Sequence, residues 1–142
     1  MRSQSEPPPI RVLVADDNDV IRQLITVNLE LEGYDVVQAA DGQACLDAIR
    51  LRHPRVVVLD RSMPQIDGLA VTAALRADPA TSGIGVVMVS AKAQQADVRR
   101  GLEGGVDVYL TKPFDPEVLI RAVRALADVR APGDAGGREG AR

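Results

Sequence analysis

The stretch VVVLDRSMP, residues Val56 to Pro64, joins four consecutive apolar residues to an aspartate. An apolar run without alternation is typical of a strand covered on both faces, as in a parallel sheet between two layers of helices. In open sheets of that kind ligands bind beyond the carboxyl ends of the strands. Asp60, at the end of this run, is therefore the first candidate site residue.

Apolar segments of strand length alternate with helical patterns along the rest of the chain. The apolar runs predict strands at residues 10–15, 34–39, 55–59, 84–90 and 107–111. Apolar residues at helical spacing predict helices at about residues 20–31, 41–49, 67–77, 95–103 and 116–129. Five β–α repeats with apolar strands predict an α/β fold, a doubly wound, parallel five-stranded sheet. We expect strand order 2-1-3-4-5, as in flavodoxin-like proteins.

The composition fits one compact domain. The chain has 142 residues, 46% of them hydrophobic and only 2% aromatic, which favours aliphatic packing of helices on a sheet. Residues 10–130 are expected to form this domain. Residues 1–9, with three consecutive prolines, and the Gly-rich residues 131–142 are predicted to be disordered, the latter as a free tail or a truncated linker.

Charge and cysteine content restrict the partners and the compartment. The net charge of −3 and the pI near 5.1 do not suggest direct nucleic-acid binding by this chain. A single cysteine, Cys45, excludes an internal disulfide framework, and no apolar run is long enough for a membrane span. The N-terminal residues lack the apolar core of a signal peptide. We therefore expect a cytoplasmic protein without a membrane partner.

Polar groups follow four of the five predicted strands, and the exception, residues 34–39, would be an edge strand. In chain order these groups are Asp16, Asp17, Asp60, Ser90 and Lys112. Three carboxylates within about 5 Å repel one another by about 3 kcal/mol per pair at an effective dielectric near 20. A divalent cation would offset that cost, and oxygen ligands favour Mg²⁺.

An aspartate beside Mg²⁺, an ammonium and a hydroxyl suits phosphoryl transfer, which needs positioning and charge stabilisation above all. Asp60 would be the nucleophile. Mg²⁺ and Lys112 would bind the phosphoryl oxygens, and Ser90 would donate a hydrogen bond to one of them.

These motifs together resemble the receiver domain of two-component response regulators, with a fold similar to that of the chemotaxis regulator. The resemblance rests on VLVADDN, VVVLDRSMPQIDG, MVSA and DVYLTKPF, in this order on the expected elements, and spans about residues 10–129. It implies a signalling switch and not an enzyme, apart from self-catalysed phosphoryl transfer and autodephosphorylation. The phosphoryl donor would be a sensor histidine kinase or a histidine phosphotransfer protein.

The resemblance also implies roles for individual residues. Asp60 would be the phosphoacceptor and, with Asp17, a direct ligand of Mg²⁺. The backbone carbonyl of Ser62 would be a further ligand, and Asp16 would act through a bound water.

The conformational switch would use Ser90 and Tyr109, and the Lys112–Pro113 bond is expected to be cis. By the resemblance, the face formed by residues 95–103, 107–111 and 116–129 would control a downstream protein or a fused output domain.

Three positions of that face, Val108, Val118 and Ala122, carry apolar residues where the transcription-factor subfamily has charges. We therefore expect an apolar docking face in place of the salt-bridged dimer of that subfamily, with a homodimer through it as an open alternative.

Two other functions compete with this interpretation. A haloacid-dehalogenase-type phosphatase needs a general acid two residues after its nucleophile, where this chain has Ser62. A receiver-like module that binds proteins without being phosphorylated keeps the same residues and stays the alternative.

The single histidine, His53, precedes a proline and has no second histidine to pair with, so we interpret it as a loop residue.

Overall fold

The computed structural model describes residues 8–129. The predicted disorder of residues 1–9 and 131–142 therefore falls outside the described residues, except for Pro8 and Pro9. The domain limits stay a prediction.

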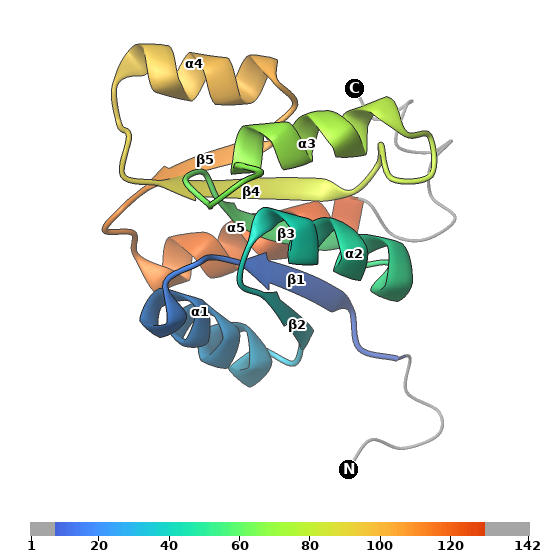
Figure 1. Ribbon diagram of the computed structural model, residues 1–142. Helices are drawn as coiled ribbons and strands as arrows, with labels where there is room; N and C mark the ends of the chain where they lie inside the picture. The colour runs from blue at the N-terminus through green and yellow to red at the C-terminus, as the bar shows by residue number, and fades with distance from the viewer. Residues whose placement is uncertain (1–7, 130–142) are drawn as a thin grey trace.

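Strands and helices alternate along the described residues (Figure 1). The strands are β1 (Arg11–Ala15), β2 (Asp35–Ala39), β3 (Val56–Asp60), β4 (Gly85–Ser90) and β5 (Val108–Thr111). The helices are α1 (Asp19–Leu31), α2 (Gly42–Arg52), α3 (Gly68–Ala77), α4 (Gln95–Glu103) and α5 (Pro116–Val129). All strand pairs are parallel and the order is β2-β1-β3-β4-β5, which confirms the predicted fold class and topology.

The central strands are buried because helices cover both faces of the sheet. Figure 1 shows α1 and α5 on one face and α2, α3 and α4 on the other. Val57 and Leu59 of β3 belong to the core under α2 and α3, whereas Val56 and Val58 belong to the core under α1 and α5. Each such side chain contributes about 1.5–3 kcal/mol by burial, which explains the unbroken apolar run before Asp60.

The loop after β3 turns back tightly on the strand end. The N–H group of Gly68 donates to the carbonyl of Arg61 at 2.9 Å. A Cβ atom on Gly68 would lie 2.6 Å from the carbonyl oxygen of Asp60, closer than side chains tolerate. Glycine therefore lets α3 begin directly beside the candidate phosphoacceptor.

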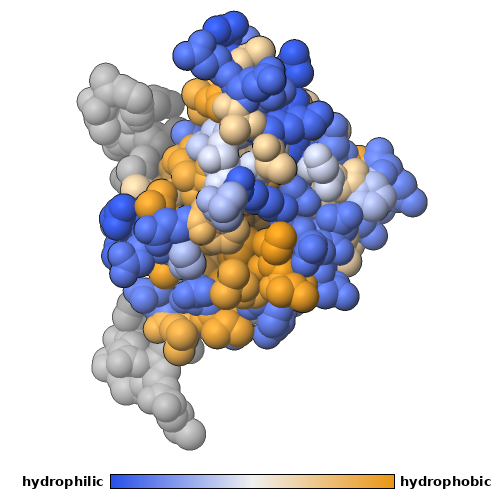
Figure 2. All heavy atoms as spheres, turned by 90° about the vertical axis from the view of Figure 1, so that its left-hand side faces the viewer, coloured by the Kyte–Doolittle hydropathy of each residue, from blue (hydrophilic) through white to orange (hydrophobic). Residues whose placement is uncertain are grey.

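The expected apolar face near β5 and α5 is only partly exposed. Val108 and Ala122 are partly buried and pack against the core under α1 and α5, and Val118 is half-buried. These side chains therefore offer less exposed apolar surface than expected, whereas a homodimer through α4, β5 and α5 stays a prediction. Exposed large apolar side chains gather instead on α1, in the lower part of Figure 2, and these are Val20, Leu24, Val27 and Leu31.

None of the helices within residues 8–129 combines the length and the apolar character that crossing a bilayer would demand.

Candidate functional site

Parallel pairing brings the carboxyl ends of β1, β3, β4 and β5 to one edge of the sheet. Asp16 and Asp17 follow β1, Asp60 and Ser90 are the last residues of β3 and β4, and Lys112 follows β5. The register places Asp60 beside Val89, and Ser90 beside Thr111. The residues that the sequence predicted to form a site therefore lie together at the carboxyl edge of the sheet.

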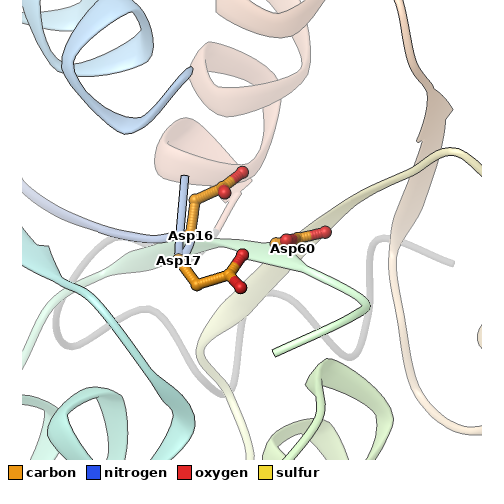
Figure 3. A group of neighbouring side chains, drawn as sticks. All are labelled: Asp16, Asp17 and Asp60. Carbon is orange, nitrogen blue, oxygen red and sulfur yellow. The ribbon is translucent and has the colours of Figure 1, made fainter. Parts of the chain in front are cut away.

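The three aspartates form a cluster. One carboxylate oxygen from each of Asp16, Asp17 and Asp60 lies within 4.8 Å of the others, and Figure 3 shows the carboxylates turned toward one common space. Asp16 is 1% exposed and Asp60 is 6% exposed, whereas Asp17 is exposed. Two of the three aspartates are thus buried, and the cluster is open to solvent at Asp17.

Lys112 joins two of these carboxylates. Its Nζ atom lies 3.4 Å from Oδ2 of Asp16 and 3.4 Å from Oδ1 of Asp60. The Lys112–Pro113 peptide bond is cis. One ammonium beside three carboxylates leaves the site with excess negative charge, which suits a cation with oxygen ligands.

The pKa of Asp60 is raised from 3.8 to about 6, first by burial and second by the charge of Asp16. Lys112 and a hydrogen bond from the backbone N–H of Ser62, at 3.3 Å to Oδ1, act in the opposite direction. Without a bound metal ion, the ionised form of Asp60 is therefore costly at this position.

The loop between β1 and α1 is fixed by Asn18, a residue that was not among the predicted site residues. Its backbone N–H donates to Oδ1 of Asp16 at 2.8 Å. Its side chain caps α1 by accepting from the N–H groups of Val20 and Ile21. Asn18 thus has two roles: it orients the carboxylate of Asp16 and it caps the start of α1. An asparagine before a helical apolar pattern is the sequence signal that indicates such a cap.

The two predicted switch residues are linked through one residue of the loop between β4 and α4. The buried hydroxyl of Ser90 accepts a hydrogen bond from the backbone N–H of Lys92 at 3.0 Å. The hydroxyl of Tyr109 donates to the carbonyl of Lys92 at 2.8 Å.

Arg61 is the main contact residue that the sequence analysis left out. Its side chain is 7% exposed, and Nη1 donates to the hydroxyl of Tyr109 at 3.2 Å. The same atom lies 3.6 Å from a carboxylate oxygen of Asp97 on α4. An arginine directly after a buried strand needs polar or charged partners inside the fold, and its position in the sequence is the signal that could have indicated such contacts.

The fold and this edge define a phosphoacceptor receiver, and the comparisons agree. Residues 12–124 match the family described as the response regulator receiver domain, so the chain belongs to that family. It is 44% identical to the "DNA-binding dual master transcriptional regulator RpaA" of Synechocystis sp., over 82% of this chain and 48% of the relative. It is 42% identical to the "DNA-binding response regulator MtrA" of Mycobacterium tuberculosis, over 81% of this chain and 49% of that relative.

Solved structures agree with this assignment. The receiver domain of Francisella response regulator 1452 superimposes with a TM-score of 0.80 at 36% identity, covering 84% of this chain and 97% of that one. Chemotaxis response regulator CheY4 of Vibrio cholerae gives 0.78 at 28% identity, covering 83% of this chain and 98% of that one.

The comparisons correct the prediction about nucleic acid. RpaA and MtrA are both named as DNA-binding, and the chain spans about half the length of these curated relatives. The exclusion of a nucleic-acid partner is therefore wrong. The net charge of −3 describes a receiver alone and carries no information about the remainder of such a regulator.

Proposed function

We propose that Asp60 accepts a phosphoryl group from a phosphohistidine of a sensor kinase or phosphotransfer protein, with Mg²⁺ bound at the aspartate cluster. The observation that carries this proposal is the position of Lys112 Nζ, 3.4 Å from both Asp16 and Asp60. An ammonium and three carboxylates around one space supply both charges that a metal-bound phosphoryl group needs.

The donor set fits Mg²⁺ because it consists of oxygens and is open on one side. Asp17 and Asp60 would be direct ligands, together with the backbone carbonyl of Ser62, and Asp16 would act through a water. Mg²⁺ keeps several waters in proteins, which matches the exposed position of Asp17. When bound, the ion offsets negative charge on the phosphoryl oxygens.

The transfer itself would be catalysed by the receiver's own residues. A carboxylate oxygen of Asp60 attacks phosphorus, the P–O bond forms, and the P–N bond to histidine breaks with its electron pair left on nitrogen. Lys112 holds one phosphoryl oxygen, and Ser90 donates a hydrogen bond to another. Water later attacks phosphorus, the P–O bond to Asp60 breaks, and inorganic phosphate leaves the restored carboxylate. No enzymatic turnover of another substrate is part of this proposal.

The response would run from Ser90 to the face of α4, β5 and α5. Ser90 turns toward the phosphoryl group, the loop at Lys92 moves, and Tyr109 follows. By analogy with RpaA and MtrA, we propose that the controlled output is a DNA-binding function. We place this phosphoryl transfer in the cytoplasm, the compartment that the sequence predicts.

Incubation of the chain with Mg²⁺ and acetyl phosphate tests the proposal by intact mass. One phosphoryl group should be gained in the wild type and in Asp67→Asn, and none in Asp60→Asn. Asp67 is a matched control because it lies in the same loop and caps α3 through Ala70, a role that asparagine also fills. Absence of a mass gain in the wild type would favour the phosphorylation-independent binding module.

A further inference from the structure

Arg61 is held rigidly where β3 ends. Its backbone N–H donates to the carbonyl of Val89 on β4 at 3.1 Å, and its carbonyl accepts from Gly68 at 2.9 Å. The side chain, 7% exposed, contacts α4 at Asp97 and β5 at Tyr109. The charges that shift the pKa of Asp60 are those of Asp16 and Lys112, and Arg61 is not among them.

The guanidinium of Arg61 connects three elements. Nη1 donates to the hydroxyl of Tyr109 on β5 at 3.2 Å and lies 3.4 Å from the carbonyl oxygen of Asp97 on α4. It also lies 3.6 Å from Oδ1 of Asp97. The phosphoacceptor strand, the first turn of α4 and the switch tyrosine are therefore joined through one cation.

The contact continues to the predicted switch hydroxyl. Tyr109 accepts from Arg61 and donates to the carbonyl of Lys92 at 2.8 Å, and the N–H of Lys92 donates to Ser90 at 3.0 Å. Arg61 and Ser90 thus lie at the two ends of a continuous chain of hydrogen bonds. A movement of Ser90 would remove the acceptor of the Lys92 N–H group, and Lys92 is the residue that holds the Tyr109 hydroxyl.

The aromatic ring of Tyr109 has a fitted place on α4. A Cβ atom at Gly101 would lie 2.8 Å from Cδ2 and 3.0 Å from Cε2 of Tyr109. Only glycine leaves room for the ring there, so the orientation of Tyr109 and the position of α4 depend on each other.

We propose that Arg61 is a positioning residue of the switch, which holds the Tyr109 hydroxyl against Lys92 and thereby couples Ser90 to α4. Stability alone does not account for a buried arginine here, because an apolar residue of similar volume is often as stabilising as a buried ion pair. The second part of this proposal, the coupling during signalling, rests on the proposed phosphorylation of Asp60. The first part, the holding of Tyr109, does not.

NMR of the full chain tests both parts, with the amide of Gly101 as reporter because the Tyr109 ring lies against it. In the resting protein, Arg61→Leu should shift or broaden the Gly101 signal. Arg61→Lys, which keeps the cation, should restore most of it. Arg99→Leu is the matched control, since Arg99 is an exposed arginine on the same helix, and should leave the signal unchanged.

The response is measured with Mg²⁺ and beryllofluoride, a non-covalent mimic of the phosphoryl group. The change that this mimic produces at Gly101 in the wild type should fall by about threefold or more in Arg61→Leu. Phosphorylation of Asp60 by acetyl phosphate should stay complete. Tyr109→Phe should reduce the response similarly, and the double variant should lose no more than either single variant, because both act through one hydroxyl.

A resting Gly101 signal unchanged in both Arg61→Leu and Tyr109→Phe would overturn the proposal even if Asp60 is phosphorylated. Additive losses in the double variant would also overturn it, because Arg61 would then act independently of Tyr109. Failure of the proposed function looks different: no mass gain at Asp60 in the wild type, with the resting shift in Arg61→Leu still present. Should Arg61→Leu not fold, Arg61→Met, which keeps an unbranched apolar stem and removes the guanidinium, supplies both measurements.

Discussion

The Nζ atom of Lys112 lies 3.4 Å from Oδ1 of Asp60, although 52 positions separate the two residues in the sequence. This ammonium opposes the burial and the Asp16 charge that raise the pKa of Asp60. The positive charge of Lys112 therefore reduces the cost of ionising Asp60 in a buried position beside Asp16.

Replacing Lys112 by alanine should raise the pKa of Asp60 above its value of about 6, because the group that lowers it is removed. Carboxyl-carbon NMR of labelled aspartate measures this shift directly. Lys92→Ala is the control, since the hydrogen bonds of Lys92 with Ser90 and Tyr109 are made by its backbone. Equal pKa values of Asp60 in wild type and Lys112→Ala would contradict the observed geometry.

Asp60→Asn should stabilise the metal-free protein, and the gain should depend on pH. The pKa of Asp60 is 3.8 unfolded and about 6 folded, so a neutral Asp60 favours folding below pH 4, and this contribution is lost as pH rises through 6. We expect a gain of about 1 to 3 kcal/mol at pH 7, the lower value where water screens the carboxylate, and almost none at pH 4. Urea unfolding in EDTA at the two pH values gives both numbers, and an equal gain at both would refute the assigned pKa.

Mg²⁺ should raise the unfolding midpoint of the wild type by mass action, because it adds about 2.7 kcal/mol to the free energy of unfolding at one hundred times its dissociation constant. Asp17→Asn should weaken this effect, because Asp17 offers one of the clustered carboxylate oxygens. Asp19→Asn is a suitable control, since Asp19 lies close in sequence but outside the cluster and pairs with Arg22. Thermal unfolding with and without EDTA measures the difference, and identical responses of the two variants would argue against the cluster as the ion site.

The parts of the fold and site that could be predicted are those set by local pattern. Apolar runs identified the strands, and parallel pairing then required Asp16, Asp60 and Lys112 to meet at one edge. The role of Arg61 could not be predicted this way, because its partners on α4 and β5 depend on how a long side chain packs. Likewise, the burial of Val108 depends on how closely α5 approaches the sheet, which the residue type does not reveal.

His53→Gly should stabilise the protein by about 0.5–1 kcal/mol, although His53 was assigned no function. His53 ends α2 in the left-handed conformation, with φ 51° and ψ 60°, which glycine adopts at lower cost. Gly33→Ala is the reciprocal control: φ is +96° and an added Cβ meets nothing within 4 Å, so only backbone strain is introduced. Opposite shifts in the urea midpoint are expected, and a destabilised His53→Gly would point to a contact of the imidazole that matters.

Arg76→Ala should destabilise the fold by about 2–4 kcal/mol. The Arg76 guanidinium donates to the backbone carbonyls of Ser82, Ile84 and Gly105, and its Nη2 atom lies 2.9 Å from Oδ2 of Asp107. The same Asp107 oxygen accepts from the N–H of Val86 at 2.8 Å, so the pair ties α3 to the starts of β4 and β5.

Arg76→Lys separates the two contributions of that side chain. An ammonium keeps the charge opposite Asp107 but cannot reproduce the planar array of donors that reaches several carbonyls at once. We therefore expect Arg76→Lys to recover less than half of the loss in the free energy of unfolding, measured by urea titration. Full recovery would mean that charge alone holds the three elements, and no loss in Arg76→Ala would mean that water replaces the guanidinium without cost. Because this cluster lies at the opposite ends of the strands from Asp60, neither variant should change the mass gain with acetyl phosphate under native conditions.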